Sequence, residues 1–203
     1  MKRSANRKTV NLVSLGILLA LVVILQFWGS GIKVGPTSFS LVLIPIALGG
    51  MLLGPSAGAI LGFTFGLITF LCGLFGLDPF TRTLLDSQFV ITMLLCIVKG
   101  TAAGWGAGFL YKMLSTKNDL LASFVAAGAA PLINTGIFAI GSLFLRGTLE
   151  ANFVGEGVNF FYFLFVGLIG INFLVEFSVN LIAAAALCRV VRVVEKHIFT
   201  QEG

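Results

Sequence analysis

Long apolar runs divide the chain, and short polar or glycine-containing stretches separate them. Six runs cover residues 11–28, 39–53, 56–77, 88–111, 120–145 and 159–188. A transmembrane helix needs about 20 mainly apolar residues to cross a hydrocarbon core of about 30 Å. The apolar positions are continuous rather than alternating, which argues against a transmembrane β-barrel. The pattern therefore predicts an all-α integral membrane protein, with six transmembrane helices in one membrane domain over residues 1–203.

Prolines interrupt two of the predicted spans. The second run is short for a full crossing and carries Pro45, so we expect it to be tilted, kinked or partly re-entrant. Pro131 lies inside the fifth run and should kink that helix, because proline removes a backbone hydrogen bond and clashes with the preceding turn.

Charge is scarce, and its position predicts an orientation. The chain is 58% hydrophobic and 10% charged, whereas soluble domains are about a quarter charged. Nine of the thirteen basic residues fall at the N-terminus, in the loop after the fourth run or in the C-terminal tail. Cytoplasmic loops are enriched in Lys and Arg, so both termini are expected to be cytoplasmic. The basic excess then reflects topology and contact with anionic lipid, with no support for nucleic-acid binding.

Small residues recur every four positions in three of the runs. One series leads into the third run and another lies in the fourth: Gly50, Gly54, Gly58, Gly62 and Gly66, then Gly100, Gly104 and Gly108. The last four glycines of the first series should share one helical face, where a neighbouring backbone can approach closely. We expect tight packing inside the bundle, with a sliding surface for a partner as the alternative. Gly16 and Ala20 suggest a docking face on the first run.

Polar residues at membrane depth are costly and need a reason. Lys99 lies near the middle of the fourth run, and Glu176 lies at comparable depth in the sixth, one turn after Asn172. Asn134 is mid-span in the fifth run. We expect Lys99 and Glu176 to form an ion pair, with hydrogen bonds from both asparagines. The pair either holds two helices together or serves a ligand or ion.

A second polar cluster falls at the predicted outer face. Asp78 and Pro79 form a helix-start signal, an N-cap residue followed by the favoured first-turn proline. On that helix Arg82 should pair with both Asp78 and Asp86, which are four residues to either side. This is either a solvated ion triad or, with Gln88, a pocket mouth at which Arg82 meets an anionic group.

Motifs for catalysis or metal binding do not occur in the sequence. There is no G-x-x-x-x-G-K-[ST] nucleotide loop and no G-x-S-x-G turn. His197 is the only histidine, and the spacing of Cys72, Cys96 and Cys188 matches no metal site or redox pair. The sequence therefore predicts a protein that is not an enzyme and needs no metal or other cofactor.

Three stretches resemble the S components of energy-coupling factor (ECF) vitamin transporters. Residues 39–63 carry a Pro-Ile…Gly…Leu-Gly-Pro-x-x-Gly-Ala pattern that is similar to the family's, between the second and third helices. The glycine-containing run over 98–111 and the Asn-x-x-x-Glu ending at 172–176 are similar too. The resemblance covers about residues 8–195.

The resemblance implies a function that the glycine pattern alone does not. S components bind one micronutrient from outside, associate with a membrane coupling protein and two ATPase subunits, and topple to release it inside. It implies a multi-pass protein of a prokaryotic cell membrane, whose nucleotide sites lie on other chains. Gly16 and Ala20 match the spacing of the family's docking motif, although alanine is usual where Gly16 stands. Residues 30–38 would form the lid over bound vitamin.

Within the family, the sequence looks most like pantothenate-type members, and riboflavin- and folate-type members share much of the pattern. Pantothenate carries a carboxylate, so its site needs a cation. The candidates for substrate binding are Arg82 and Lys99 for the carboxylate, Asn134 and Asn172 for hydroxyl and amide groups, and Gln88 and Glu176 beside them.

Two alternatives stay open from the residues. One is a proton-coupled secondary carrier that uses Lys99 and Glu176 as its relay, although no internal repeat is visible. The other is a non-transporting scaffold for envelope assembly, with the glycine faces as docking surfaces. Uptake without ATP or partners would favour the first, and ligand binding by the isolated chain would exclude the second.

Overall fold

The long elements of the structure are all helices. A computed structural model describes residues 2–29, 33–34, 37–38 and 41–199. The helices are α1 (Lys2–Gly29), α2 (Leu43–Leu53), α3 (Pro55–Leu74), α4 (Pro79–Ser87), α5 (Phe89–Leu114), α6 (Asp119–Phe144), α7 (Arg146–Phe153), α8 (Phe160–Tyr162), the π-helix η1 (Phe163–Leu168) and α9 (Gly170–Phe199). Two short strands, β1 (Lys33–Val34) and β2 (Thr37–Ser38), pair antiparallel.

Five segments are long and apolar enough to cross a membrane. They are Lys8–Trp28, Pro55–Leu74, Phe89–Leu114, Asp119–Phe144 and Phe160–Val194. The sixth apolar helix, α2, has only 11 residues, as its short run indicated. The all-α membrane bundle is therefore confirmed, with one span shorter than the rest. The run expected over 159–188 forms one of these segments, within which α8, η1 and α9 follow one another.

Local signals explain where several helices begin. The Asn118 side chain accepts hydrogen bonds from the backbone N–H groups of Leu120 and Leu121, which caps α6. Asn159 caps α8 in the same way. Pro55 and Pro79 occupy the first turns of α3 and α4, where a missing N–H costs nothing.

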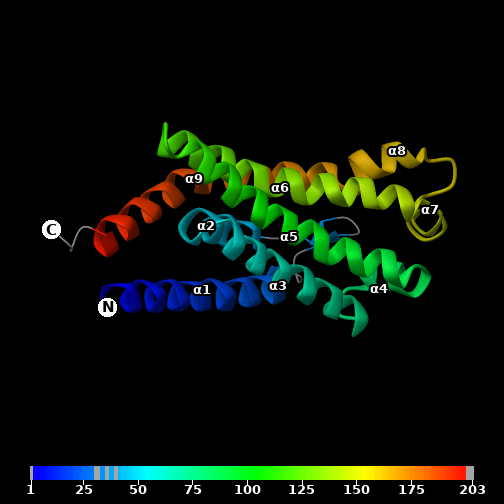
Figure 1. Cartoon of the computed structure of the whole chain (residues 1–203). Coiled ribbons are helices and arrows are strands. Elements are labelled where there is room, and N and C mark those ends of the chain that lie inside the picture. Colours follow the sequence, from blue (N-terminus) through cyan, green and yellow to red (C-terminus); the bar gives the residue numbers. More distant parts are fainter. Residues whose placement is uncertain (1, 30–32, 35–36, 39–40, 200–203) are drawn as a thin grey trace.

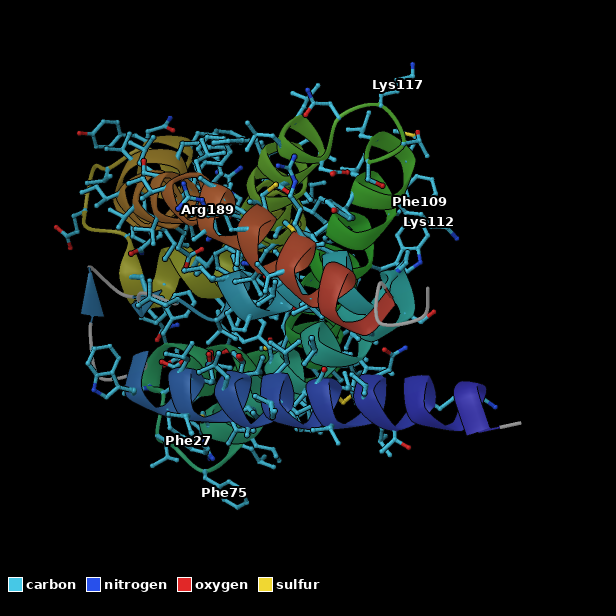
Figure 2. The ribbon with its side chains drawn as sticks, turned by 90° about the vertical axis from the view of Figure 1, so that its left-hand side faces the viewer. Phe27, Phe75, Phe109, Lys112, Lys117 and Arg189 are labelled. Atoms are coloured by element: carbon cyan, nitrogen blue, oxygen red, sulfur yellow. The ribbon has the colours of Figure 1, made fainter. Side chains whose placement is uncertain are left out.

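The helices form an elongated bundle with distinct ends (Figure 1). The start of α1 and the end of α9 lie at one end, and α4, α7 and α8 lie at the other. Near the terminal end, Arg192 Nε of α9 lies 3.4 Å from Asp119 Oδ2 at the start of α6. Phe27 and Phe75 point away from the bundle (Figure 2), as expected of side chains that face lipid.

Glycines bring α3 and α5 into backbone contact. A Cβ atom placed on Gly58 would collide with the Gly104 carbonyl, and one on Gly62 would collide with the Gly100 carbonyl. Gly66 faces the Cys96 carbonyl in the same manner. We call this contact the glycine seam. It shows the tight internal packing expected from the four-residue spacing.

The seam differs from the prediction at one glycine. Gly54 is not on the helical face of α3; it separates α2 from α3 with φ at 94°, and a Cβ there would meet nothing within 4 Å. Glycine favours this backbone conformation because it has no Cβ. Gly50 of α2 extends the seam instead, since its Cβ would lie 2.9 Å from the Gly108 nitrogen.

Substitution within the seam should destabilise the protein. Gly62→Ala puts a methyl group against the backbone of α5. We expect the free energy of unfolding to fall by about 1–3 kcal/mol or more. Gly16→Ala is the matched control, because a Cβ at Gly16 meets nothing within 4 Å. Thermal unfolding of the purified protein in detergent measures both. Equal melting temperatures for the two variants would contradict the seam.

Candidate functional site

A cavity of about 130 Å³ lies between the bundle helices, towards the end that carries α4. We call it the chamber. Its polar lining comes from six helices and the turn before α4: Gln26, Thr69, Asp78, Thr81, Thr92, Lys99, Asn134, Thr135, Asn172 and Glu176. Its aromatic lining is Phe65, Phe80, Phe138 and Phe173. A concave, mainly apolar site with a few convergent polar groups is typical of small-molecule binding.

Lys99 is held by aromatic rings. Its Nζ lies 5.7 Å from the centre of the Phe65 ring and 5.2 Å from that of Phe138. Both distances suit a cation–π interaction, which stabilises an ammonium group away from bulk water. The expected ion pair between Lys99 and Glu176 stays a prediction. The two residues line the same chamber, as their matching depth suggested.

Two buried oxygens of the lining have no hydrogen-bond partner within the described protein. They are Thr92 Oγ1 and Asn134 Oδ1, on residues that are 1% and 8% exposed. A buried polar atom without a partner costs about 1–3 kcal/mol. These atoms are therefore suited to a ligand that offers hydrogen-bonding groups of its own.

The α9 side of the chamber carries Asn172 and Glu176. Asn172 Nδ2 donates to the Leu168 carbonyl at 3.3 Å, and Glu176 is 8% exposed. One turn further along α9, Asn180 Nδ2 donates to the Glu176 carbonyl at 2.8 Å. The polar residues that the sequence singled out on the fourth, fifth and sixth runs thus converge on one cavity.

Arg82 and Gln88 lie outside the chamber. Arg82 Nε pairs with Asp86 at 2.9 Å and its Nη1 donates to the Leu74 carbonyl at 2.8 Å, with both ion-pair side chains about half exposed. Asp78 accepts instead from the Thr81 hydroxyl, so the expected triad is only a pair. Gln88 Nε2 lies 3.4 Å from the Phe144 carbonyl. Thr81 competes for Asp78, which the spacing of charges alone does not show.

Several lining residues were not predicted. Thr92 lies two helical turns before Lys99 on the same face of α5, and this spacing was available in the sequence. Gln26 reaches the chamber from α1, and its Nε2 donates to Thr69 Oγ1 at 3.2 Å. A single glutamine near the end of an apolar run was its only signal. The rings of Phe65 and Phe138 resembled ordinary core positions.

The proposed docking residues lie on the outer surface of α1. Gly16 and Ala20 are exposed, whereas Leu18 and Val22 of the same helix are buried against the bundle. The expected lid over 30–38 lies largely outside the described residues, and only β1 and β2 are described there. Cys72, Cys96 and Cys188 are buried free thiols. Among described residues, no group of three or more His, Cys, Asp or Glu side chains could hold a metal ion.

Comparison with known proteins finds one matching family model. A family model described as "ECF transporter, substrate-specific component" matches residues 10–191. No curated protein matches the sequence. The matched range contains every residue of the chamber and both halves of the glycine seam.

Removal of an unpartnered hydroxyl should not destabilise the ligand-free protein. Thr92→Val keeps the shape of the side chain and deletes an oxygen that has no partner, so we expect an unchanged or raised melting temperature. Thr101→Val is the control, because the Thr101 hydroxyl donates to the Ile97 carbonyl at 2.8 Å and lies outside the chamber. A lower melting temperature for Thr92→Val than for the control would count against an orphaned Thr92 oxygen.

Proposed function

Because the chain belongs to the ECF transporter substrate-specific component family, we propose that its chamber binds one small water-soluble vitamin for ATP-driven uptake by partner subunits. The protein is a transporter component of a multi-pass membrane type, not an enzyme. The observation that carries the proposal is the chamber itself. Lys99 lies there against two rings, and two buried oxygens of the lining have no hydrogen-bond partner among the described residues.

The chamber chemistry favours an elongated monocarboxylate with hydroxyl or amide groups, and pantothenate has this form. Lys99 would bind the carboxylate, since it is the one basic residue among the described residues that line the chamber. Thr92 lies seven residues away on α5, or about 10 Å along the helix axis. Asn134 and Asn172 would bind polar groups between these ends. Glu176 would accept a hydrogen bond from a ligand O–H or N–H group.

The partners follow from the family. S components work with a membrane coupling protein and an ATPase module. We propose that the coupling protein packs on the outer face of α1, where Gly16 and Ala20 leave room for a close helix contact. Only 11% of the apolar stretch of α1 is buried inside the bundle, so most of the surface of this helix is open to lipid or a partner.

The distribution of basic residues supports the orientation. Lys112 lies in the last turn of α5 and Lys117 follows that helix. Arg189 and Arg192 lie in the C-terminal half of α9, on the side of the bundle where α1 begins. This end would face the cytoplasm. The chamber would then lie towards the outside of the cell, where a vitamin enters.

The alternatives have less support. A secondary carrier built on Lys99 and Glu176 is not what the family description names, which is a substrate-specific component of an ECF transporter. The glycine faces, which the scaffold hypothesis would use for docking, are occupied by each other inside the bundle. Both observations favour the ECF function.

A vitamin screen tests the proposal. We expect pantothenate to raise the melting temperature of the purified protein, because a ligand that binds only the folded state stabilises it. Lys99→Gln should weaken pantothenate binding at least about tenfold, since a hydrogen bond to a charged group contributes about 1.5–3 kcal/mol. Lys112→Gln, an exposed change outside the chamber, should leave the affinity unchanged. Yellow flavin bound to the purified protein, or full affinity in Lys99→Gln, would contradict pantothenate at Lys99.

A further inference from the structure

The sixth apolar run contains a π-helical segment where it meets the chamber. η1 covers Phe163–Leu168, and the Ile169 N–H donates to the Leu164 carbonyl, five residues back, at 3.0 Å. A π turn holds about one residue more than an α turn, and such turns are frequent at functional sites. Leu168 and Ile169, at the end of η1, line the chamber.

Helix geometry shows what this extra residue does. Leu164 and Glu176 are twelve residues apart and both are buried, Leu164 in the apolar cluster around Phe80 and Glu176 in the chamber wall. At about 100° per residue, an uninterrupted α-helix would place them about 120° apart. One residue absorbed by the π turn reduces this angle to about 20°.

A second pair of residues has the same separation along the helix. Phe160 and Asn172 are also twelve residues apart, and Phe160 belongs to the same apolar cluster as Leu164. Without the π turn, a helix that kept Phe160 and Leu164 in that cluster would turn Asn172 and Glu176 away from the chamber. We propose that η1 is a positioning element of the binding site, which rotates Asn172 and Glu176 of α9 into the chamber wall.

Two glycines near η1 provide a matched pair for the test. A Cβ on Gly170 would lie 2.5 Å from the Phe165 carbonyl oxygen, a contact that the π turn cannot accept. A Cβ on Gly167 would meet only the Phe163 ring, at an ordinary 3.4 Å. Gly170→Ala should therefore drive the turn out of its π geometry, whereas Gly167→Ala should leave it intact.

Removal of the extra residue should restore the alignment. Val166 is half-exposed, and its deletion shortens the Leu164–Glu176 separation to eleven residues. Eleven residues in a plain α-helix leave the two side chains about 20° apart, the same angle that the π turn achieves. The deletion should therefore compensate for Gly170→Ala by making the π turn unnecessary.

The inference rests on the proposed function, so binding of pantothenate and the other B vitamins is measured by calorimetry on four proteins. They are the unaltered chain, Gly167→Ala, Gly170→Ala, and Gly170→Ala with Val166 deleted. We expect Gly170→Ala to bind the preferred vitamin at least about tenfold more weakly, and the double variant to recover to within about threefold of the unaltered chain.

The outcomes separate a failure of the positioning role of η1 from a failure of the proposed function. Full affinity in Gly170→Ala, or equal weakness in Gly170→Ala and the double variant, would overturn the positioning role of η1. If the unaltered chain binds no vitamin, the proposed function fails. Melting temperatures of the ligand-free proteins then judge the π turn: loss in Gly170→Ala and recovery in the double variant supports it, and any other pattern overturns it.

Discussion

Backbone contact between α3 and α5 is the interaction on which the rest of the structure depends. Along the glycine seam Gly58, Gly62 and Gly66 face Gly104, Gly100 and Cys96, with no side chain between the helices at the glycine pairs. Van der Waals contact of this kind is a main source of helix association in a membrane, where burial from water contributes little. The seam ends at the next turns, where Thr69 of α3 and Thr92 of α5 line the chamber. Phe65, Cys96 and Lys99, which lie along this end of the seam, line the chamber as well.

The scarcity of charge in this chain gives its few polar groups at membrane depth particular weight. Lys99 lies against the rings of Phe65 and Phe138 and lines the chamber. Thr92 and Asn134 keep oxygens that no group in the described part of the chain satisfies. A site of this kind carries a cost in the ligand-free state that a complementary ligand relieves.

Periodicity predicted the parts that depend on one helix at a time. Apolar runs located the spans, and four-residue glycine spacing located the seam, because both follow from the rise and turn of an α-helix. Depth along each run also brought Lys99, Asn134, Asn172 and Glu176 to one level, and the structure places all four in the chamber.

Features that depend on contacts between elements, or on a change of helix type, were not predictable in this way. The contacts of the Lys99 ammonium with the rings of Phe65 and Phe138 had no signal in the spacing of polar residues. Thr81 takes Asp78, which leaves Arg82 to Asp86 and outside the chamber. The π turn leaves no repeating pattern in the sequence. Its one sign is that the buried residues before it and after it would not share a face of an uninterrupted α-helix.

The central claim is that a chamber in this chain loads a vitamin whose uptake is driven by ATP hydrolysis on other subunits. Vesicles that contain the chain together with an ECF coupling protein and its ATPases test it most directly, with labelled pantothenate outside and ATP inside or omitted. The account predicts accumulation only when the partners and ATP are both present. Accumulation by the chain alone, driven by a proton gradient without ATP, would contradict it.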